Sequence, residues 1–395
     1  MAHRIALSLN AAQDNYFRRA AGTARFAYNW ALERWNRRYA EHLADPTLPR
    51  PSYMSVRKEL NAVKRTEYPW MMQVTKCAPD EAVRNLGDAF QNWFNSISGK
   101  RKGPKVKAPQ VKKKGRHDKF KLTSGTFTVE DQRIRVPKLG WVRMREPLRF
   151  TGKLISATFS KTADRWFVSI TVDTEDGPRR PAENQGVAGV DLGISNLLTL
   201  STGEVIPGRK PQKGLLPRLR RLARSLSRKT PKSNNRKKAK AKLARVNARI
   251  ANIRQDEMHK LTTDLSRRFH TLVIEDLNVK GMVKNRHLSR ALSDMAFGEF
   301  RRQLTYKVAM RGGQLIVADR WYPSSKLCSS CGHQLAALPL SARNWTCPVC
   351  GVHHDRDVNA AINLEKLAAG AVVTAYGAGS SDAGSNAGVK LPAAK

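Results

Sequence analysis

Acidic side chains are scarce in this chain of 395 residues: 32 Asp and Glu stand against 72 Lys and Arg, a formal net charge of +40. An excess of this size indicates an anionic partner, with phosphate backbones first and an anionic membrane surface second. No apolar run reaches the roughly 18 residues of a membrane span, and residues 1–5 lack the apolar core of a secretory signal. We therefore expect a soluble, intracellular protein with two or three domains.

Cysteine is also scarce, and its distribution is uneven. Cys77 is isolated, whereas the other four cysteines lie close together in the sequence as Cys328-x2-Cys331, fifteen residues, then Cys347-x2-Cys350. In a reducing compartment a tight group of four indicates a metal site rather than disulfides. The spacing is typical of a zinc ribbon, in which four thiolates fill the tetrahedral shell of a structural Zn²⁺.

The residues around these cysteines support the same interpretation. Gly332 and Gly351 follow the second cysteine of each pair, where such a turn favours a residue without a β-carbon. His333, His353 and His354 are expected to be surface residues rather than ligands, because four cysteines already complete the shell.

Hydrophobic periodicity divides the N-terminal half. Residues 1–9 alternate weakly and predict one strand, while residues 10–97 show helical stripes that are typical of a packed bundle. The period falls to two from residue 120 to residue 176, which predicts antiparallel hairpins of a small sheet or barrel. The N-terminal strand can join this sheet, so that the helices form an insertion.

Two stretches carry basic charge almost without acids. Residues 100–121 contain one acid, Asp118, and several Gly and Pro residues, so they predict either a solvated linker or a strap lying on phosphates. No acid occurs between Glu204 and Asp256, where two helices are predicted to join near residues 231–235. A solvated helix face would alternate Glu with Lys, so this stretch indicates a polyanion-binding surface. The candidate contacts are Lys112, Lys113, Lys114, Arg220, Arg221, Arg224, Arg228, Lys237 and Lys238.

Three acids in the C-terminal half stand at comparable places. Asp191 ends a short apolar strand, Glu275 ends a second one, and Asp357 lies where a final helix opens. A packing helix over residues 292–308 and a strand over 312–318 complete an α/β pattern. Alone, Asp357 or Asp355 is equally well explained as a helix cap.

Taken together, the three acids follow the carboxylate layout of RNase H-like sheets. Carboxylates that converge within a few ångströms cannot all stay ionised without cations. Their hard oxygen ligands select Mg²⁺ or Mn²⁺. Two such ions support in-line phosphodiester cleavage.

Four motifs carry a family resemblance: Gly-Val-Asp191-Leu-Gly, Ile-Glu275-Asp-Leu, the paired cysteines, and His-Asp-Arg-Asp357-x-Asn-Ala-Ala. In combination they resemble the RuvC-type core of TnpB proteins, transposon-encoded RNA-guided DNA endonucleases related to compact type V CRISPR effectors. The resemblance covers nearly the whole chain, although the N-terminal half matches by layout alone.

The resemblance implies a multidomain α+β protein in which an RNase H-like (RuvC) α/β domain holds a zinc ribbon and a small β-barrel wedge domain carries a helical bundle. Its implied segments are the wedge (1–9 and 117–182), the recognition domain (10–116), the RuvC-like domain (183–325 and 354–369), the zinc ribbon (326–353) and a disordered tail (370–395).

The resemblance also implies partners and roles. A guide RNA would fill the basic surface, and target double-stranded DNA would be cut at two Mg²⁺ or Mn²⁺ ions held by Asp191, Glu275 and Asp357. Asp357 is chosen over Asp355 because the family's acid stands two residues before an asparagine, here Asn359. The protein would be cytoplasmic, and nucleoid-associated when bound to DNA. The residues implied to read a short target-adjacent motif are Tyr53, Lys76, Thr123 and Ser124.

Two alternatives remain open. One is a DNA-binding transposase or its accessory protein, which would bind transposon ends without RNA. The other is an RNA-guided transcriptional repressor without cleavage, although this chain retains all three acids. RNA that co-purifies with the protein separates the endonuclease from the transposase, and a cleavage assay separates it from the repressor.

Overall fold

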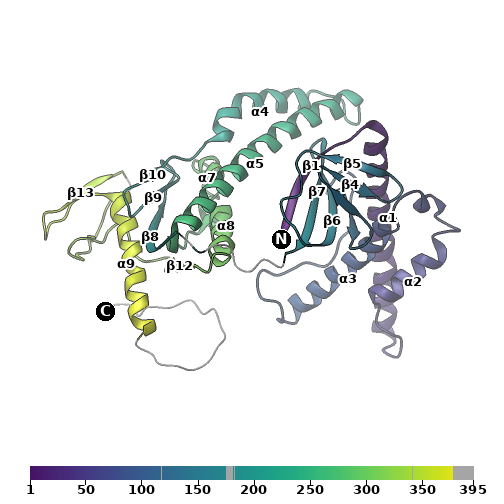
Figure 1. The fold of residues 1–395 in the computed structure, drawn as a ribbon, viewed down its shortest axis with the longest axis horizontal. Helices are drawn as coiled ribbons and strands as arrows, with labels where there is room; N and C mark the ends of the chain where they lie inside the picture. Colours follow the sequence, from purple (N-terminus) through teal and green to yellow (C-terminus); the bar gives the residue numbers. More distant parts are fainter. Residues whose placement is uncertain (117, 175–180, 182, 340, 377–395) are drawn as a thin grey trace. The chain divides into compact units, whose positions relative to one another are not determined.

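The computed structural model describes residues 1–116, 118–174, 181, 183–339 and 341–376. The chain divides into two compact units, Met1–Glu175 and Asp176–Lys395 (Figure 1). Within the described ranges, no helix has both the length and the apolar character that crossing a bilayer requires.

A seven-stranded antiparallel sheet forms one half of the first unit. Its order is β2-β6-β7-β1-β5-β4-β3, and the hydrogen-bonded pairs leave β2 and β3 as edges in the part of the chain that is described. The predicted hairpins are therefore present, whereas closure into a barrel is not observed there. The strands are β1 (Ala2–Ser8), β2 (Lys119–Thr123), β3 (Thr128–Glu130), β4 (Arg133–Val136), β5 (Gly140–Met144), β6 (Lys153–Thr162) and β7 (Arg165–Asp173).

The helices of the first unit are α1 (Ala11–Ala44), α2 (Tyr53–Val63), α3 (Cys77–Ile97) and the short 3-10 helix η1 (Pro69–Gln73). Helices α1 and α3 pack directly on this sheet, and α2 packs on both of them. Phe17 of α1 is fully buried, and its ring centroid lies 5.0 Å from that of Phe159 and 5.3 Å from that of Trp166. Helices and strands thus share one continuous hydrophobic core rather than two separate cores.

A mixed five-stranded sheet forms the centre of the second unit. Its order is β10-β9-β8-β11-β12; β9 and β10 are antiparallel to their neighbours, and β8, β11 and β12 are parallel to one another. Neighbouring parallel strands end at the same edge of a sheet, which brings the carboxyl ends of β8 and β11 together. The strands are β8 (Asn184–Leu192), β9 (Leu198–Leu200), β10 (Val205–Ile206), β11 (Phe269–Glu275) and β12 (Gln314–Ala318).

Helices cover both faces of this sheet. One face packs on α5 (Asn234–Arg268), α7 (Ser289–Met295) and α8 (Phe297–Ala309), and the other packs on α9 (Arg356–Tyr376). The prediction of a single helix over residues 292–308 was wrong. Ala296 adopts a left-handed conformation (φ 52°) that separates α7 from α8. The short helix α6 (Val279–Met282) precedes them.

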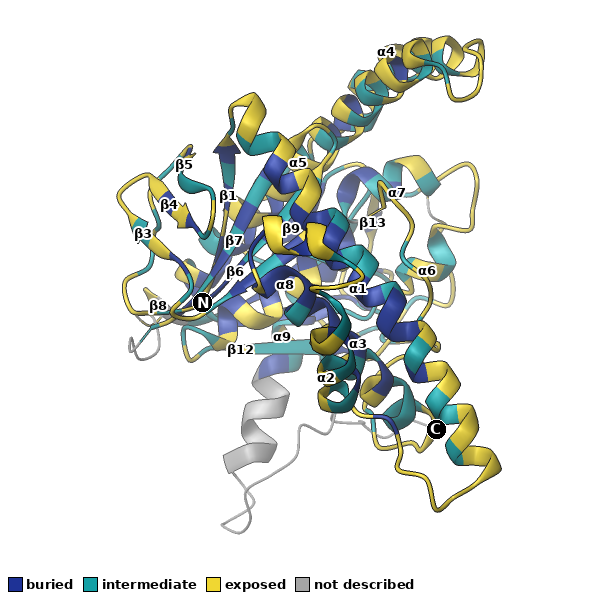
Figure 2. Cartoon of the chain, turned by 90° about the vertical axis from the view of Figure 1, so that its right-hand side faces the viewer, coloured by how far each residue is buried: buried dark blue, intermediate teal, exposed yellow. Residues whose placement is uncertain are grey.

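Helix α4 (Pro211–Ser227) and the first half of α5 form a helical hairpin (Figure 1). Most of α4 is exposed (Figure 2), and Pro211 is its one buried residue. The buried carboxylate of Asp294, on α7, accepts hydrogen bonds from the backbone N–H groups of Gln212 and Lys213 and pairs with Arg254 at 2.6 Å. The base of the hairpin is therefore fixed to the core by a satisfied ion pair.

The C-terminal region combines a small ribbon with the final helix. Strands β13 (Asn344–Thr346) and β14 (His353–Asp355) pair antiparallel, and α9 follows directly. Helix α9 continues to Tyr376, so residues 370–376 are helical rather than part of the expected disordered tail. The rest of that predicted tail, residues 377–395, lies outside the described residues.

Candidate functional site

Parallel strand pairing positions two of the three predicted acids. Ile274 of β11 pairs with Val190 of β8, so Glu275 and Asp191 are the next residues along the same ladder. Val190 and Ile274 are fully buried, and both acids are half-buried where the strands end. The apolar strand interiors thus deliver two carboxylates to one edge of the sheet.

Helix α9 brings in the third acid. The Asp355 carboxylate accepts hydrogen bonds from the backbone N–H groups of Asp357 (3.0 Å) and Val358 (2.9 Å), and so it caps the helix. Because Asp355 occupies the cap, Asp357 lies in the first turn with its side chain available to the strand ends. The two acids that the sequence left as alternatives therefore have different local roles.

Close contact between α9 and β8 depends on Gly189. A β-carbon built at Gly189 would lie 1.9 Å from the carbonyl oxygen of Ala361 and 2.6 Å from the backbone nitrogen of Glu365. Only a glycine allows the two backbones to approach so closely. Since Ala361 lies one helical turn after Asp357, this approach helps to set the position of the Asp357 side chain.

The three carboxylates affect one another electrostatically. Burial raises the pKa of Asp191 to about 8, and the negative charges of Glu275 and Asp357 raise it in the same direction. Arg356 opposes this effect only in part. A carboxyl group with such a raised pKa lacks enough positive charge around it, which is the condition that a bound cation relieves.

Ser324 and Arg343 contact two of the acids, and the sequence contained no motif that marked either. The buried Ser324 hydroxyl donates to Glu275 Oε1 at 2.5 Å. Arg343 donates to Asp357 Oδ1 at 3.4 Å and to Ser195 Oγ at 3.3 Å. Both residues lie in irregular segments, where the contacts depend on the tertiary fold rather than on a spacing.

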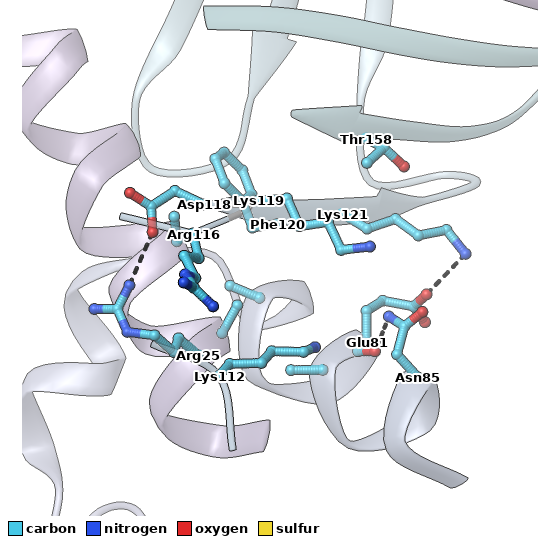
Figure 3. Close-up of a pocket in the computed structure, with 14 residues that line it drawn as sticks. Arg25, Glu81, Asn85, Lys112, Arg116, Asp118, Lys119, Phe120, Lys121 and Thr158 are labelled. Carbon is cyan, nitrogen blue, oxygen red and sulfur yellow. Dashed lines mark hydrogen bonds and ion pairs between the residues drawn. The ribbon is translucent and has the colours of Figure 1, made fainter. Parts of the chain in front are cut away.

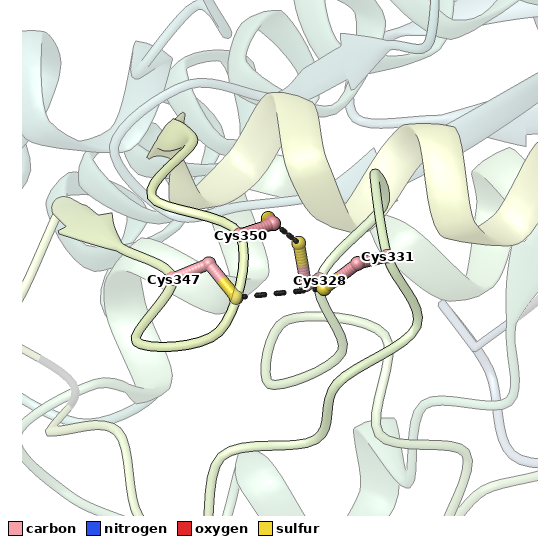
Figure 4. Close-up of side chains that lie close together, drawn as sticks. All are labelled: Cys328, Cys331, Cys347 and Cys350. Atoms are coloured by element: carbon pink, nitrogen blue, oxygen red, sulfur yellow. Dashed lines mark hydrogen bonds between the residues drawn. The ribbon is translucent and has the colours of Figure 1, made fainter.

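The four cysteines converge as predicted. They form the one group of three or more His, Cys, Asp or Glu side chains in the described residues whose ligand atoms all lie within 4.8 Å of one another (Figure 4). The Sγ atoms of Cys328 and Cys350 are 3.6 Å apart, as are those of Cys331 and Cys347. Four Zn–S bonds of about 2.3 Å in a tetrahedron place sulfurs roughly 3.8 Å apart, so the group fits Zn²⁺.

The turns behind these cysteines also have the predicted form. Gly332 and Gly351 adopt positive φ angles of 76° and 71°, and each donates its N–H to the carbonyl of the first cysteine in its pair. Hydrogen bonds from the backbone N–H groups of Cys350 and Val349 lower the pKa of Cys347. They therefore favour the thiolate form that binds a metal.

The expectation that His354 is a surface residue was wrong. Its side chain is buried against Trp345, and its Nε2 lies 3.0 Å from Cys328 Sγ. The reason is that β14 pairs with β13, which turns His354 into the small core of the ribbon. In this position the imidazole supports a cysteine rather than replacing one.

Two buried asparagines connect the ribbon to α9. Asn359 accepts from the N–H of Ser329 (2.9 Å) and donates to the carbonyl of Leu327 (2.8 Å). Asn363, one turn later, donates to the carbonyls of Ser324 and Leu327. The first cysteine turn is thus bonded to the same helix that carries Asp357.

The predicted polyanion contacts on the helical hairpin are all exposed. They are Arg220, Arg221, Arg224 and Arg228, on or just after α4, and Lys237 and Lys238 on α5. The leucines between the arginines of α4, Leu219, Leu222 and Leu226, are half-buried instead. The hairpin therefore presents basic side chains to solvent.

Three lysines of the 100–121 segment differ in their surroundings. Lys113 and Lys114 are exposed, but Lys112 is half-buried and its Nζ lies 3.3 Å from the centroid of the Tyr28 ring. Burial, followed by repulsion from Lys119, lowers the pKa of Lys112 to about 8. Figure 3 shows this lysine in a cavity of about 80 Å³ between α1, α3 and β2.

The four residues implied to read a target-adjacent motif lie in one region of the first unit. Tyr53 and Thr123 line the same cavity of about 280 Å³, together with Arg84, whose guanidinium lies over the Tyr53 ring. Lys76 directly precedes α3, and Ser124 directly follows β2. Both are exposed.

Three family models match the chain in succession. A model described as "Probable transposase" matches residues 168–286, and one described as "Cas12f1-like, TNB domain" matches residues 297–364. A third, described as "Helix-turn-helix domain", matches residues 1–43. In this structure those residues form β1 and one uninterrupted helix.

Curated relatives decide the family. A protein of Streptomyces pristinaespiralis with the provisional name RNA-guided DNA endonuclease is 41% identical over 367 residues, 91% of this chain and 87% of that protein. InsQ of Escherichia coli, with the same provisional name, is 34% identical over 92% of this chain and 91% of its own length. A TnpB-like protein of Acanthamoeba polyphaga mimivirus is 30% identical over 141 residues, 34% of this chain and 26% of that protein. The chain belongs to the TnpB family.

The fold of this TnpB chain also matches a solved structure. The protein in the cryo-EM structure of the Cas12f1-sgRNA-target DNA complex aligns over 89% of this chain and 83% of that chain, with a TM-score of 0.53 and 14% sequence identity. At this identity the likeness concerns the fold alone. It supports the mixed α/β architecture on which the three acids are arranged.

Proposed function

We propose that this TnpB protein is an RNA-guided DNA endonuclease that cleaves DNA phosphodiesters at Asp191, Glu275 and Asp357. The observation that carries the proposal is the convergence of these acids: Asp191 and Glu275 follow paired residues of one parallel ladder, and the charges of Glu275 and Asp357 both act on Asp191. The provisional names of two relatives that align over nine-tenths of this chain support the same activity.

The three acids would hold Mg²⁺ or Mn²⁺, for which carboxylate oxygens are the appropriate ligands. Two such ions, roughly 3.5–4 Å apart, are the arrangement that supports in-line phosphodiester cleavage. When bound, the ions supply a water of lowered pKa and neutralise charge on the phosphate.

The remaining side chains of the site orient the acids and the substrate. Ser324 holds Glu275 through a short hydrogen bond, which fixes the orientation of that carboxylate. Arg343 lies beside Asp357 and carries a planar set of donors suited to a phosphate. Asp357 itself would turn from Arg343 towards the ions, leaving the guanidinium to the phosphate of the bound strand.

The zinc ribbon would act as a structural element. Cys328, Cys331, Cys347 and Cys350 would bind Zn²⁺ with no open position, so the ion takes no part in the chemistry. Its effect on cleavage would pass through Asn359 and Asn363, which bond the first cysteine turn to α9, and through Arg343 of the ribbon, which donates to Asp357.

The basic surfaces would hold the nucleic acids. The hairpin and the 100–121 segment would contact the guide RNA and its duplex with target DNA, and Tyr53, Lys76, Thr123 and Ser124 would read the target-adjacent motif. In domain terms, residues 1–9 and 117–182 would form the wedge and 10–116 the recognition domain. Residues 183–325 and 354–369 would form the RNase H-like nuclease domain around the ribbon at 326–353.

The test begins with the protein purified from cells that carry its gene and flanking DNA. Sequencing of co-purifying RNA identifies the guide, and a plasmid with the matching target then reports Mg²⁺-dependent cutting. Asp191→Ala should abolish cutting while RNA and target binding stay nearly unchanged. Asp256→Ala, which removes an exposed acid of α5, serves as the control and should cut normally.

Each alternative predicts a different result. A transposase would bind the ends of its element without RNA and join strands rather than only cut them. A repressor would bind guide RNA and target but leave the wild-type plasmid intact. Loss of target binding in Asp191→Ala would instead show that this acid is structural.

A further inference from the structure

One aromatic side chain near the acids has no packing role. Trp321 is 85% exposed, the highest exposure of any large apolar side chain in the described residues. Scattered surface apolar residues are common and need no explanation by themselves. What distinguishes Trp321 is its position near the acids, on a loop whose backbone is held by hydrogen bonds.

The loop that carries Trp321 is held at several points. The backbone N–H of Trp321 donates to Asp319 Oδ1 at 2.9 Å, and the N–H of Tyr322 donates to the Asp319 carbonyl at 3.1 Å. Arg320 pairs with Asp276 at 2.6 Å. The loop backbone is therefore held in place, and the indole projects from it into solvent.

This place is next to the carboxylate site. Ala318 pairs with Glu275 in the β11–β12 ladder, and Ser324 donates to the Glu275 carboxylate. Trp321 lies midway between these two contacts along the chain. Three residues span at most about 11 Å, so the Trp321 backbone lies within that distance of Ala318.

We propose that Trp321 stacks on an unpaired base of the DNA strand that is cut, and so positions that strand at the carboxylates. The face of an indole can stack on any base, so this contact would be independent of sequence. It requires a base that is free of its own neighbours, which favours a single strand over a duplex. The inference rests on the proposed function, because it identifies the substrate strand at the same site.

Cleavage by three variants tests the stacking. Loss of one stacked base corresponds to about a 5- to 150-fold change, so Trp321→Ala should slow single-turnover cutting by a factor in this range. Trp321→Phe should restore most of the rate, whereas Trp321→Leu, which keeps apolar bulk without a ring, should not. Val205→Ala is the control, since Val205 is also exposed but lies on β10 at the opposite edge of the sheet.

Targets with a single abasic nucleotide locate the partner base. When the abasic nucleotide is moved along the strand near the cut, cutting by the wild type should be slowest at one position. On the target with the abasic nucleotide at that position, Trp321→Ala should cut at the same rate as the wild type. Equal rates for wild type and Trp321→Ala, or full rescue by Leu, would overturn the inference. So would self-association without nucleic acid that Trp321→Ala abolishes, because the indole would then bind a second copy of the chain.

Fluorescence separates a failure of this inference from a failure of the proposed function. The difference in emission between wild type and Trp321→Phe isolates this indole, and an added single-stranded oligonucleotide should quench it more than a fully abasic oligonucleotide of equal length. If the oligonucleotide quenches the emission but the protein never cuts DNA, the stacking inference holds and the proposed nuclease activity is rejected. If the protein cuts DNA normally but the emission is not quenched, the proposed nuclease activity holds and the stacking inference is rejected.

Discussion

Replacing Gly189 by alanine is a sharp test of how the site is assembled. The new β-carbon would lie 1.9 Å from the carbonyl oxygen of Ala361, while ordinary contact begins at 3.4 Å. The backbones of β8 and α9 would therefore have to separate by about 1.5 Å. Because the obstruction is backbone rather than a flexible side chain, no rotamer change can relieve it.

The consequence for activity follows from the position of Asp357 on the same helix. A shift of about 1 Å in catalytic geometry can cost on the order of 10²-fold in rate, so single-turnover cutting should fall by about that factor or more. Overpacking of this kind also costs about 1–3 kcal/mol of stability. For a domain of this size that lowers the melting temperature by about 2–4 °C per kcal/mol.

The assay combines plasmid cleavage with guide-RNA binding and thermal melting. Gly298→Ala is the matched control, because Gly298 lies in α8 and a β-carbon added there would have nothing within 4 Å. This substitution should be neutral or stabilise the protein by about 0.4–1 kcal/mol. Guide-RNA binding and a cooperative melt should persist in Gly189→Ala. A variant that is folded and cuts at the wild-type rate would refute the account of how α9 sets Asp357.

Three further predictions address the zinc, the acids and the basic hairpin. Cys347→Ser should lose the bound zinc, measured by elemental analysis, and should slow cutting more than it weakens guide-RNA binding. In the metal-free protein the pKa of Asp191 is about 8 against an ordinary 3.8, so the folded chain keeps a proton that the unfolded chain has lost. Stability should therefore fall as pH rises between about 4 and 8, and Asp191→Asn should flatten the melting temperature across that range. Arg220→Ala with Arg224→Ala should leave the melting temperature unchanged but reduce the salt dependence of guide-RNA binding, by about 0.7 in logarithmic slope for each phosphate of a single strand that the variant no longer neutralises.

The elements that the sequence predicted well are those with strong local signals. The paired cysteines and the glycines after them predicted the four-sulfur group and its turns, because ligand spacing and backbone conformation are local properties. Apolar runs ending in Asp191 and Glu275 predicted two strands that end in acids. These two strands pair side by side in a parallel arrangement, which is the arrangement that the α/β pattern already indicated.

The features that the sequence did not predict depend on contacts between distant residues. The periodicity over residues 292–308 suits one helix, but Ala296 adopts a left-handed conformation that ends α7 before α8 begins. The sequence around His354 suggests a surface residue, and only the pairing of β14 with β13 buries its side chain. Ser324 and Arg343 touch the acids through loops, and no spacing in the sequence marks such contacts.

Helix α9 links features that the sequence presents as separate motifs. Its first turn carries Asp357, its backbone at Ala361 and Glu365 lies against Gly189 of β8, and its asparagines bond to the first cysteine turn. A change in the ribbon can therefore reach Asp357 through α9, as well as through the direct contact of Arg343 with Asp357. On this reasoning, loss of zinc and substitution of Gly189 should produce the same kind of defect: cutting slows more than guide-RNA binding weakens. Substitutions on α4 should produce the opposite defect, since that helix lies on the hairpin and is fixed to the other face of the sheet through Asp294.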